Sequence, residues 1–164
     1  MSQKPRILMV DTNVWVDLYV PGRPHRDTSL AFFEATLRND VELVYTLEIA
    51  RDVFRIVSYE AKRWVKEGTG TLSEPHARAI AAHAWDFIED MQRYGTPVGS
   101  ATQDLWMATK LRDDHAEIED DLIVAACMRI HADYLVTNDA KLIRHAPVAT
   151  VTPETMTKLL AISV

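Results

Sequence analysis

The strongest constraint on the fold is a short apolar run near the start of the chain, Ile7–Val10, which ends directly on the polar triplet Asp11-Thr12-Asn13. A half-exposed strand would alternate polar and apolar residues, so an uninterrupted run predicts a strand that is buried on both faces. Asp11 is then expected at the carboxyl end of this strand. Open parallel α/β sheets bind their ligands outside the carboxyl ends of the strands, so the triplet marks a candidate functional site.

The same triplet has a simpler interpretation as the start of the next helix. Residues 13–18 continue in a helical pattern, and Thr12 or Asn13 could cap it, because Asn, Asp and Thr are all ordinary capping residues. The position at the strand end alone does not distinguish capping from function.

The rest of the chain alternates between strand and helix patterns. Further strands are predicted at 41–45 and 134–136, with a short extended piece at 97–98 and a last strand at 148–151. Helices are predicted at 27–38, 46–66, 73–94, 101–111 and 118–131, and a last helix is predicted to begin at Thr152. This alternation predicts the α/β class, with a central parallel sheet between helices. No linker or repeat divides the chain, so we expect a single domain over residues 1–164.

Composition limits where in the cell the protein is expected and how it could bind nucleic acid. The 164 residues carry a net charge of −6, which argues against binding nucleic acid through overall charge and leaves only a local basic patch. No secretory signal or membrane-spanning run is visible, and Cys127 has no partner for an intrachain disulfide, so we expect a cytoplasmic protein without a membrane contact. The four tryptophans fall in helical patterns with apolar neighbours and are expected in the core.

Two predicted strands end in related polar triplets, Asp11-Thr12-Asn13 and Thr137-Asn138-Asp139. If the two strands are parallel neighbours, their terminal carboxylates reach the same edge of the sheet. Mg²⁺ and Mn²⁺ prefer oxygen ligands, so this arrangement could form a metal site without cysteine or histidine. Like charges disfavour joint ionisation, and without a metal one or more of these acids should therefore have a raised pKa.

A third carboxylate is expected from the apolar helix at 118–131. Its beginning is rich in acids, which the helix dipole favours, and they comprise Glu117, Glu119, Asp120 and Asp121. Asp120 or Asp121 could face the same crevice, and periodicity does not choose between them.

The helix predicted at 46–66 offers a fourth carboxylate. At about 100° per residue its apolar residues share one sector, and a basic stripe lies opposite, formed by Arg51, Arg55, Tyr59, Lys62 and Lys66. Glu48 falls within the stripe, whereas Asp52 falls at its boundary with the apolar sector, which favours Asp52 as the ligand and leaves Glu48 as the alternative. The stripe is a candidate track for a phosphate backbone, although basic residues on a helix face are usually only solvated.

Taken in order, these pieces resemble the PIN-domain nucleases, including the VapC-type toxins of bacterial toxin–antitoxin pairs. The matching pieces are Val10-Asp11-Thr12-Asn13, the stretch from Asp120 to Ala126, and Leu135-Val136-Thr137-Asn138-Asp139. The resemblance implies an α/β/α sandwich and a Mg²⁺- or Mn²⁺-dependent endoribonuclease that hydrolyses phosphodiester bonds of RNA. It also implies an antitoxin as a protein partner and a homodimer. The RNA target is not implied.

Carried over by position, the resemblance makes Asp11, Asp120 and Asp139 metal-binding acids. Thr137 becomes the hydroxyl beside the metal, and Asn13 becomes a polar support.

The family's remaining acid is usually a Glu on the helix that follows the second strand, shortly after a Ser or Thr that closes that strand. Counting on from Thr46 reaches Asp52, so this chain has Asp in place of Glu, and Glu48 stays the alternative.

Two other functions are compatible with parts of the pattern. A phosphatase of the haloacid-dehalogenase type also begins with a strand that ends on Asp, but it would need a second acid where this chain has Asn13. A PIN-like scaffold could instead bind RNA or a protein without cutting. The presence of all four candidate acids disfavours that alternative.

Overall fold

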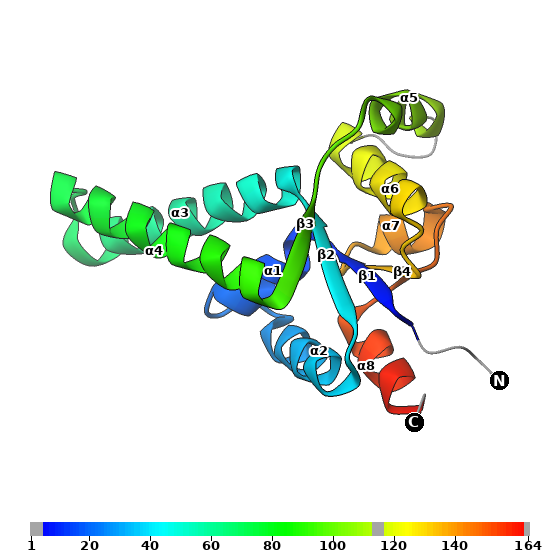
Figure 1. The fold of residues 1–164 in the computed structure, drawn as a ribbon. Coiled ribbons are helices and arrows are strands. Elements are labelled where there is room, and N and C mark those ends of the chain that lie inside the picture. Colours follow the sequence, from blue (N-terminus) through cyan, green and yellow to red (C-terminus); the bar gives the residue numbers. More distant parts are fainter. Residues whose placement is uncertain (1–4, 113–116, 163–164) are drawn as a thin grey trace.

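A computed structural model describes residues 5–112 and 117–162. Among these residues, five strands form one sheet in the order β3-β2-β1-β4-β5, and every pairing is parallel (Figure 1). The strands are β1 (Ile7–Val10), β2 (Glu42–Thr46), β3 (Gly95–Val98), β4 (Tyr134–Val136) and β5 (Thr150–Val151). The helices are α1 (Thr12–Tyr19), α2 (Arg26–Asn39), α3 (Leu47–Thr69), α4 (Glu74–Tyr94), α5 (Thr102–Leu111), α6 (Ile118–Ile130), α7 (Ala140–His145) and α8 (Pro153–Ile162). The predicted α/β sandwich with a central parallel sheet is confirmed.

The first strand occupies the middle of the sheet. Leu8, Met9 and Val10 are fully buried, because β1 has a strand on each side and helices over its faces. Val10 pairs with Val136 of β4, so the two strands that end in polar triplets are parallel neighbours. Their polar ends therefore leave the sheet at the same edge.

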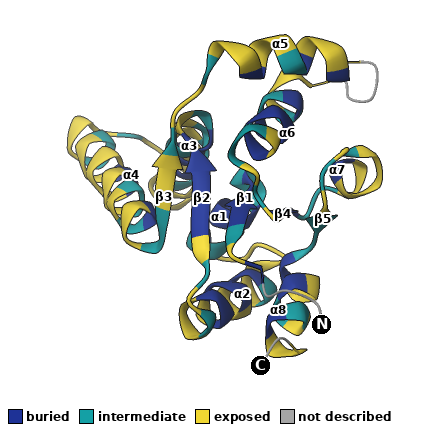
Figure 2. Ribbon diagram, turned by 45° about the vertical axis from the view of Figure 1, so that its right-hand side comes forward, coloured by how far each residue is buried: buried dark blue, intermediate teal, exposed yellow. Residues whose placement is uncertain are grey.

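An aromatic cluster anchors α1 beside the sheet. Trp15 is fully buried, and its ring centroid lies 4.7 Å from that of Phe33 on α2 and 5.6 Å from that of Tyr45 on β2. Figure 2 shows the buried faces of α1, α2 and β2 turned inward. This packing fixes the helix that begins at the carboxyl end of β1.

The third strand lies unusually close to its neighbour. A Cβ atom at Gly95 would stand 2.8 Å from the backbone oxygen of Leu43, so glycine is needed where β3 begins to pair with β2. The pairing continues to Val98, which makes β3 longer than the predicted extended piece at 97–98.

Helices α3 and α4 pack against each other and extend beyond the sheet (Figure 1). Trp64 on α3 is 40% exposed, and Trp85 on α4 is 59% exposed and packs against Phe54. Trp106 on α5 is also exposed, so the prediction of four core tryptophans is wrong for three of them. Periodicity identifies the apolar face of a helix, but it does not reveal whether the core is long enough to cover that face.

Two smaller predictions also need correction, and one helix was not predicted. The N-cap of α1 is Asp11 itself, whose side chain accepts a hydrogen bond from the Thr12 backbone, and not Thr12 or Asn13. The short helix α7 was not predicted, and it begins where Asp139 accepts hydrogen bonds from two backbone N–H groups. The last strand covers only 150–151 instead of 148–151.

Among the described helices, none is long and apolar enough to cross a membrane.

Candidate active site

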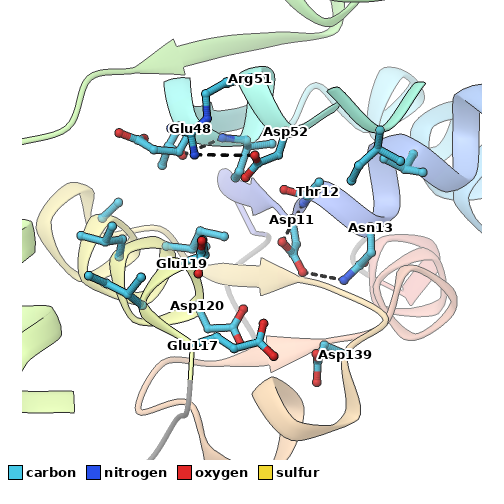
Figure 3. A pocket seen from close by; sticks show the side chains of 18 of the residues that line it. Asp11, Thr12, Asn13, Glu48, Arg51, Asp52, Glu117, Glu119, Asp120 and Asp139 are labelled. Carbon is cyan, nitrogen blue, oxygen red and sulfur yellow. Dashed lines mark hydrogen bonds and ion pairs between the residues drawn. The ribbon is translucent and has the colours of Figure 1, made fainter. Parts of the chain in front are cut away.

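A cavity of about 700 Å³ opens at the carboxyl ends of the central strands. Asp11 and Asp139 line it from the sheet, Asp52 lines it from α3, and Asp120 lines it from α6 (Figure 3). The structure therefore brings together one predicted acid from each of four segments. Other polar and charged lining residues include Asn13, Glu48, Glu117, Glu119, Arg23, Arg51 and Arg55.

Asp11 is held by its neighbours on the sheet side. Its side chain is almost completely buried, with 5% exposed. One carboxylate oxygen accepts a hydrogen bond from the backbone N–H of Thr12 at 2.6 Å. The other accepts one from the Thr137 hydroxyl and one from the Asn13 amide, each at 2.6 Å. The backbone N–H of Asp11 also donates to the Val136 oxygen, so the carboxylate has one fixed orientation.

Thr137 joins the ends of the two strands. Its hydroxyl is buried, donates to Asp11, and accepts hydrogen bonds from the Asn13 amide at 2.9 Å and from the Asp139 backbone N–H at 2.9 Å. Thr137 does not itself line the cavity. In this structure it acts on the cavity by fixing Asp11 and the backbone of Asp139.

Burial raises the pKa of the Asp11 carboxyl, and the charge of Asp139 adds to that effect. Hydrogen bonds from Thr137, Thr12 and Asn13 oppose it but do not cancel it. The expected raised pKa is present, although its largest cause is burial and not the neighbouring acid. A cation beside Asp11 would stabilise the ionised form that burial disfavours.

Asp139 also begins the short helix α7. Its Oδ1 accepts hydrogen bonds from the backbone N–H groups of Lys141 at 2.6 Å and Leu142 at 3.2 Å. These bonds hold the carboxylate at the edge of the cavity. Asp139 is thus oriented by α7, as Asp11 is oriented by α1.

Of the two candidate acids of α3, Asp52 is held less firmly than the acids of the sheet edge. Asp52 is 16% exposed and lies 3.6 Å from the guanidinium groups of Arg51 and Arg55, which are 68% and 73% exposed. Its partial burial agrees with a boundary position on the helix. Glu48 also lines the cavity and accepts a hydrogen bond from the Ser100 hydroxyl. Burial acts to raise the pKa of Glu48, but the bond from Ser100 and the charge of Arg51 hold that pKa below its usual value.

The two adjacent acids in the first turn of α6, Asp120 and Asp121, differ in their position relative to the cavity. Asp120 is partly buried and lines the cavity, whereas Asp121 is 3% exposed and does not line it. Glu117 and Glu119 are exposed at the rim. In Figure 3 the side chains of Glu117 and Asp120 lie across the cavity from Asp11. This placement favours Asp120 over Asp121 as the ligand from α6.

The donors suit a hard divalent cation, since they are carboxylate oxygens around a buried acid of raised pKa. As the side chains stand, no three His, Cys, Asp or Glu residues in the described ranges are close enough together to hold a metal ion. Coordination of one cation by three or more of these acids would therefore require their side chains to come closer together.

Two residues near Asp11 were missed by the sequence analysis. Asp17 on α1 is 1% exposed, and its carboxylate accepts hydrogen bonds from Arg23 Nε at 2.7 Å and from the Asn138 amide at 2.9 Å. Asp17 is one helical turn after Asn13, so the spacing could have placed both on one face. Arg23 lies in a Pro- and Gly-containing loop, where the sequence carried no signal for its position.

An ion pair between α5 and α6 borders the cavity. Arg129 Nε and Nη2 donate to the two carboxylate oxygens of Asp104 at 2.8 and 3.0 Å, and Nη2 also donates to the Gly99 backbone oxygen at 2.7 Å. Burial acts to raise the pKa of Asp104, but the bonds from Arg129 and from the Ala101 backbone leave it below its usual value. This pair fixes the start of α5 against α6.

Comparisons with known proteins agree with this geometry. The family model described as a PIN domain matches residues 7–141. The fold is similar to that of VapBC2 from Rickettsia felis, solved bound to a DNA fragment from their promoter, with a TM-score of 0.63, 16% identity, and coverage of 89% of this chain and 98% of that chain. It is also similar to PAE2754 from Pyrobaculum aerophilum, with a TM-score of 0.61, 13% identity, and coverage of 96% and 90%. No curated protein matches the chain.

The matched region contains the three sequence pieces that suggested the family and both strands that end in the polar triplets. The two solved structures support the fold independently of sequence identity. The chain belongs to the PIN-domain family, whose members are generally nucleases.

Proposed function

We propose that this protein is a metal-dependent endoribonuclease that hydrolyses phosphodiester bonds of RNA. The observation that carries the proposal is the convergence of Asp11, Asp52, Asp120 and Asp139 on one cavity, although they come from four separate segments of the chain. Such a set of oxygen donors at the carboxyl edge of a parallel sheet is suited to Mg²⁺ or Mn²⁺ and a phosphate substrate.

In this proposal the four acids hold the cation, with Glu48 as the alternative to Asp52 and Asp121 as the less favoured alternative to Asp120. Asn13 and Thr137 keep the Asp11 carboxylate oriented through their hydrogen bonds. When bound, the cation would activate a water molecule for attack and offset the negative charge of the scissile phosphate.

The choice of RNA as substrate rests on the resemblance to VapC-type toxins. Three arginines line the cavity among the acids and could contact the phosphate backbone, namely Arg23, Arg51 and Arg55. The basic stripe on α3 begins with two of them and continues along exposed positions to Lys66. This local patch supports a nucleic-acid contact in a chain whose net charge is −6.

The same resemblance supports a biological role as the toxin of a type II toxin–antitoxin pair. We propose an antitoxin protein as its partner and a homodimer as its assembly, acting in the cytoplasm, where RNA substrates are available. Residues 1–164 are proposed to form a single domain, since the sheet draws its strands from both the amino-terminal and the carboxyl-terminal parts of the described chain.

The test is incubation of the purified protein and of its Asp11→Asn variant with a mixed-sequence single-stranded RNA, in Mn²⁺, in Mg²⁺ and in chelator. Cleavage by the wild type in metal alone, absent in the variant, is the expected result. Circular dichroism of the variant would verify that its fold is intact. Equal cleavage by the folded variant would refute the site.

If RNA stays intact in every condition while a titration still detects metal binding, the metal site stands, and either the enzyme cuts only a specific RNA target or the protein is a PIN-like binding module. Hydrolysis of an aryl phosphate ester that depends on Asp11 would instead revive the phosphatase alternative. Asn13 argues against that outcome, because it occupies the position where such a phosphatase carries its second acid and here donates to Asp11.

A further inference from the structure

We propose that Arg23 binds a phosphate group of the RNA backbone beside the reacting centre, and that Asp17 is the residue that positions it. The inference rests on the proposed nuclease function and names a contact for its substrate. It begins from the placement of Arg23, which lines the same cavity as Asp11 and Asp139 although it lies in the loop between α1 and α2.

The loop directs Arg23 back toward the sheet edge. Gly22 has φ = +77°, a left-handed conformation that favours glycine, and Pro24 fixes the backbone on the other side. The Arg23 carbonyl accepts a hydrogen bond from the backbone N–H of Arg26 at 3.3 Å. The side chain then extends to Asp17, whose carboxylate lies 2.7 Å from Arg23 Nε.

Asp17 ties Arg23 to the proposed metal site. This buried carboxylate also accepts a hydrogen bond from the Asn138 amide at 2.9 Å, and the Asn138 backbone N–H donates to the Asn13 side chain at 2.9 Å. Asn13 in turn donates to Asp11 at 2.6 Å. A continuous series of hydrogen bonds therefore fixes the guanidinium relative to Asp11.

The bond to Asp17 leaves most of the guanidinium available. Arginine has five N–H donors, and in the part of the chain that the structure describes only Nε of Arg23 has a partner. The side chain is 40% exposed, so its terminal nitrogens can reach a ligand. Guanidinium groups bind phosphate with two parallel hydrogen bonds, which makes a phosphodiester a suitable ligand.

Other arginines near the cavity are less suited to this role. Arg129 already uses Nε and Nη2 in its bonds with Asp104 and Gly99. Arg51 and Arg55 are at least two-thirds exposed and lie 3.6 Å from Asp52, so neither is held by a buried partner. Arg23 combines a buried anchor with available donors, whereas these three residues each lack one of the two.

Arg23 could have the purely structural role of neutralising Asp17, and the experiment must separate the two roles. In the uncleaving Asp11→Asn background, fluorescence anisotropy would measure the affinity for a single-stranded RNA in Mg²⁺ at several salt concentrations. The variants are Arg23→Ala and the double variant Asp17→Asn/Arg23→Gln, which removes both charges together. Arg38→Ala is the matched control, because it removes the same charge from an exposed position at the other end of α2.

We expect both Arg23 variants to bind RNA about tenfold more weakly, the loss of roughly one charge-assisted contact. The slope of log K against log salt should fall by about 0.7, the value for one phosphate on a single strand. Arg38→Ala should leave both quantities unchanged. Thermal unfolding would show that Arg23→Ala is less stable, because it leaves a buried carboxylate without its charged partner, whereas the double variant avoids that cost.

Normal RNA affinity in the double variant would overturn the inference, since Arg23 would then serve only to neutralise Asp17. If wild-type protein cuts RNA while both Arg23 variants bind it normally, the nuclease proposal stands and the inference falls. If the wild type does not cut but the Arg23 variants lose affinity as expected, the phosphate contact stands without the nuclease. The absence of RNA binding in every protein would overturn the inference as well.

Discussion

The two halves of the cavity differ in how firmly their acids are held. On the sheet half, Asp11 and Asp139 are oriented by hydrogen bonds from Thr137, from Asn13 and from the starts of two helices. On the helix half, the contacts of Asp52 within the described residues are two ion pairs at 3.6 Å with exposed arginines. The structure thus fixes the two acids of the sheet half by hydrogen bonds, whereas the ion-pair partners of Asp52 in the described residues, Arg51 and Arg55, are themselves exposed.

The largest effect is expected from breaking the sheet half at Thr137. Thr137→Val removes the hydroxyl that contacts Asp11, Asn13 and the Asp139 backbone, so metal affinity and RNA cleavage should fall by about 10- to 100-fold. The free energy of unfolding should also fall by about 1–3 kcal/mol, because buried partners lose a hydrogen bond. Isothermal titration and chemical denaturation would measure these losses.

Thr137→Ser retains the hydroxyl and is the matched control for that change. It should recover most of the metal affinity lost in Thr137→Val. If the serine and valine variants have the same metal affinity, the Thr137 hydroxyl does not orient Asp11, and the hydrogen bonds described for the sheet half do not support metal binding.

The Asp104–Arg129 pair holds α5 against α6 on the helix side of the cavity. Asp104→Asn should lower the free energy of unfolding by about 2 kcal/mol at pH 7, since hydrogen bonds to charged groups contribute that much. Because the folded-state pKa of Asp104 is below its unfolded value, its stabilisation is complete above the unfolded value of 3.8 and disappears as the pH falls through the folded value. Denaturation at several pH values should therefore show the two proteins converging in acid. A difference that grows as the pH falls would contradict this assignment.

A smaller effect should identify the ligand from α3. Asp52→Asn should weaken Mn²⁺ binding by roughly tenfold, as expected for a loosely held ligand, whereas Glu48→Gln should change it by less than about twofold. Each variant removes one charge from the same helix, so they serve as controls for each other. The reverse order of effects would make Glu48 the ligand.

The smallest effect on metal binding is expected from Asp121. Asp121→Asn should leave Mn²⁺ affinity within about twofold of the wild type, because this buried side chain does not line the cavity. Asp120→Asn should reduce that affinity by roughly tenfold. A larger loss from Asp121 would require the first turn of α6 to rotate when metal binds.

The sheet half was also the half that could be predicted from the sequence. The apolar run before Asp11 and its counterpart before Thr137 report burial directly, and parallel pairing then brings their polar ends together. The position of Asp52 followed from helical periodicity. Which of Asp120 and Asp121 faces the cavity could not be derived, because adjacent residues on a buried helix share the same pattern and only the tertiary packing separates them.

Contacts made through loops could not be predicted either. Arg23 reaches Asp17 because the loop after α1 turns back at Gly22, and neither periodicity nor composition specifies that path. The exposure of Trp64 and Trp85 was missed for a related reason, since their amphipathic helices extend past the core. Local sequence patterns predict the helices and strands and the apolar face of each helix. How far the core extends along a helix, and which path a loop takes, depend on the packing of the whole chain.

The most direct test of the account is a Mn²⁺ titration followed by electron paramagnetic resonance, comparing the wild type with Asp11→Asn and Asp120→Asn. These two acids lie on opposite halves of the cavity, and circular dichroism would confirm that each variant is folded. If the halves form one metal site, the wild type should bind Mn²⁺ and each variant should bind it at least about tenfold more weakly. Unchanged Mn²⁺ affinity in either folded variant would contradict the claim that the two halves hold the same cation.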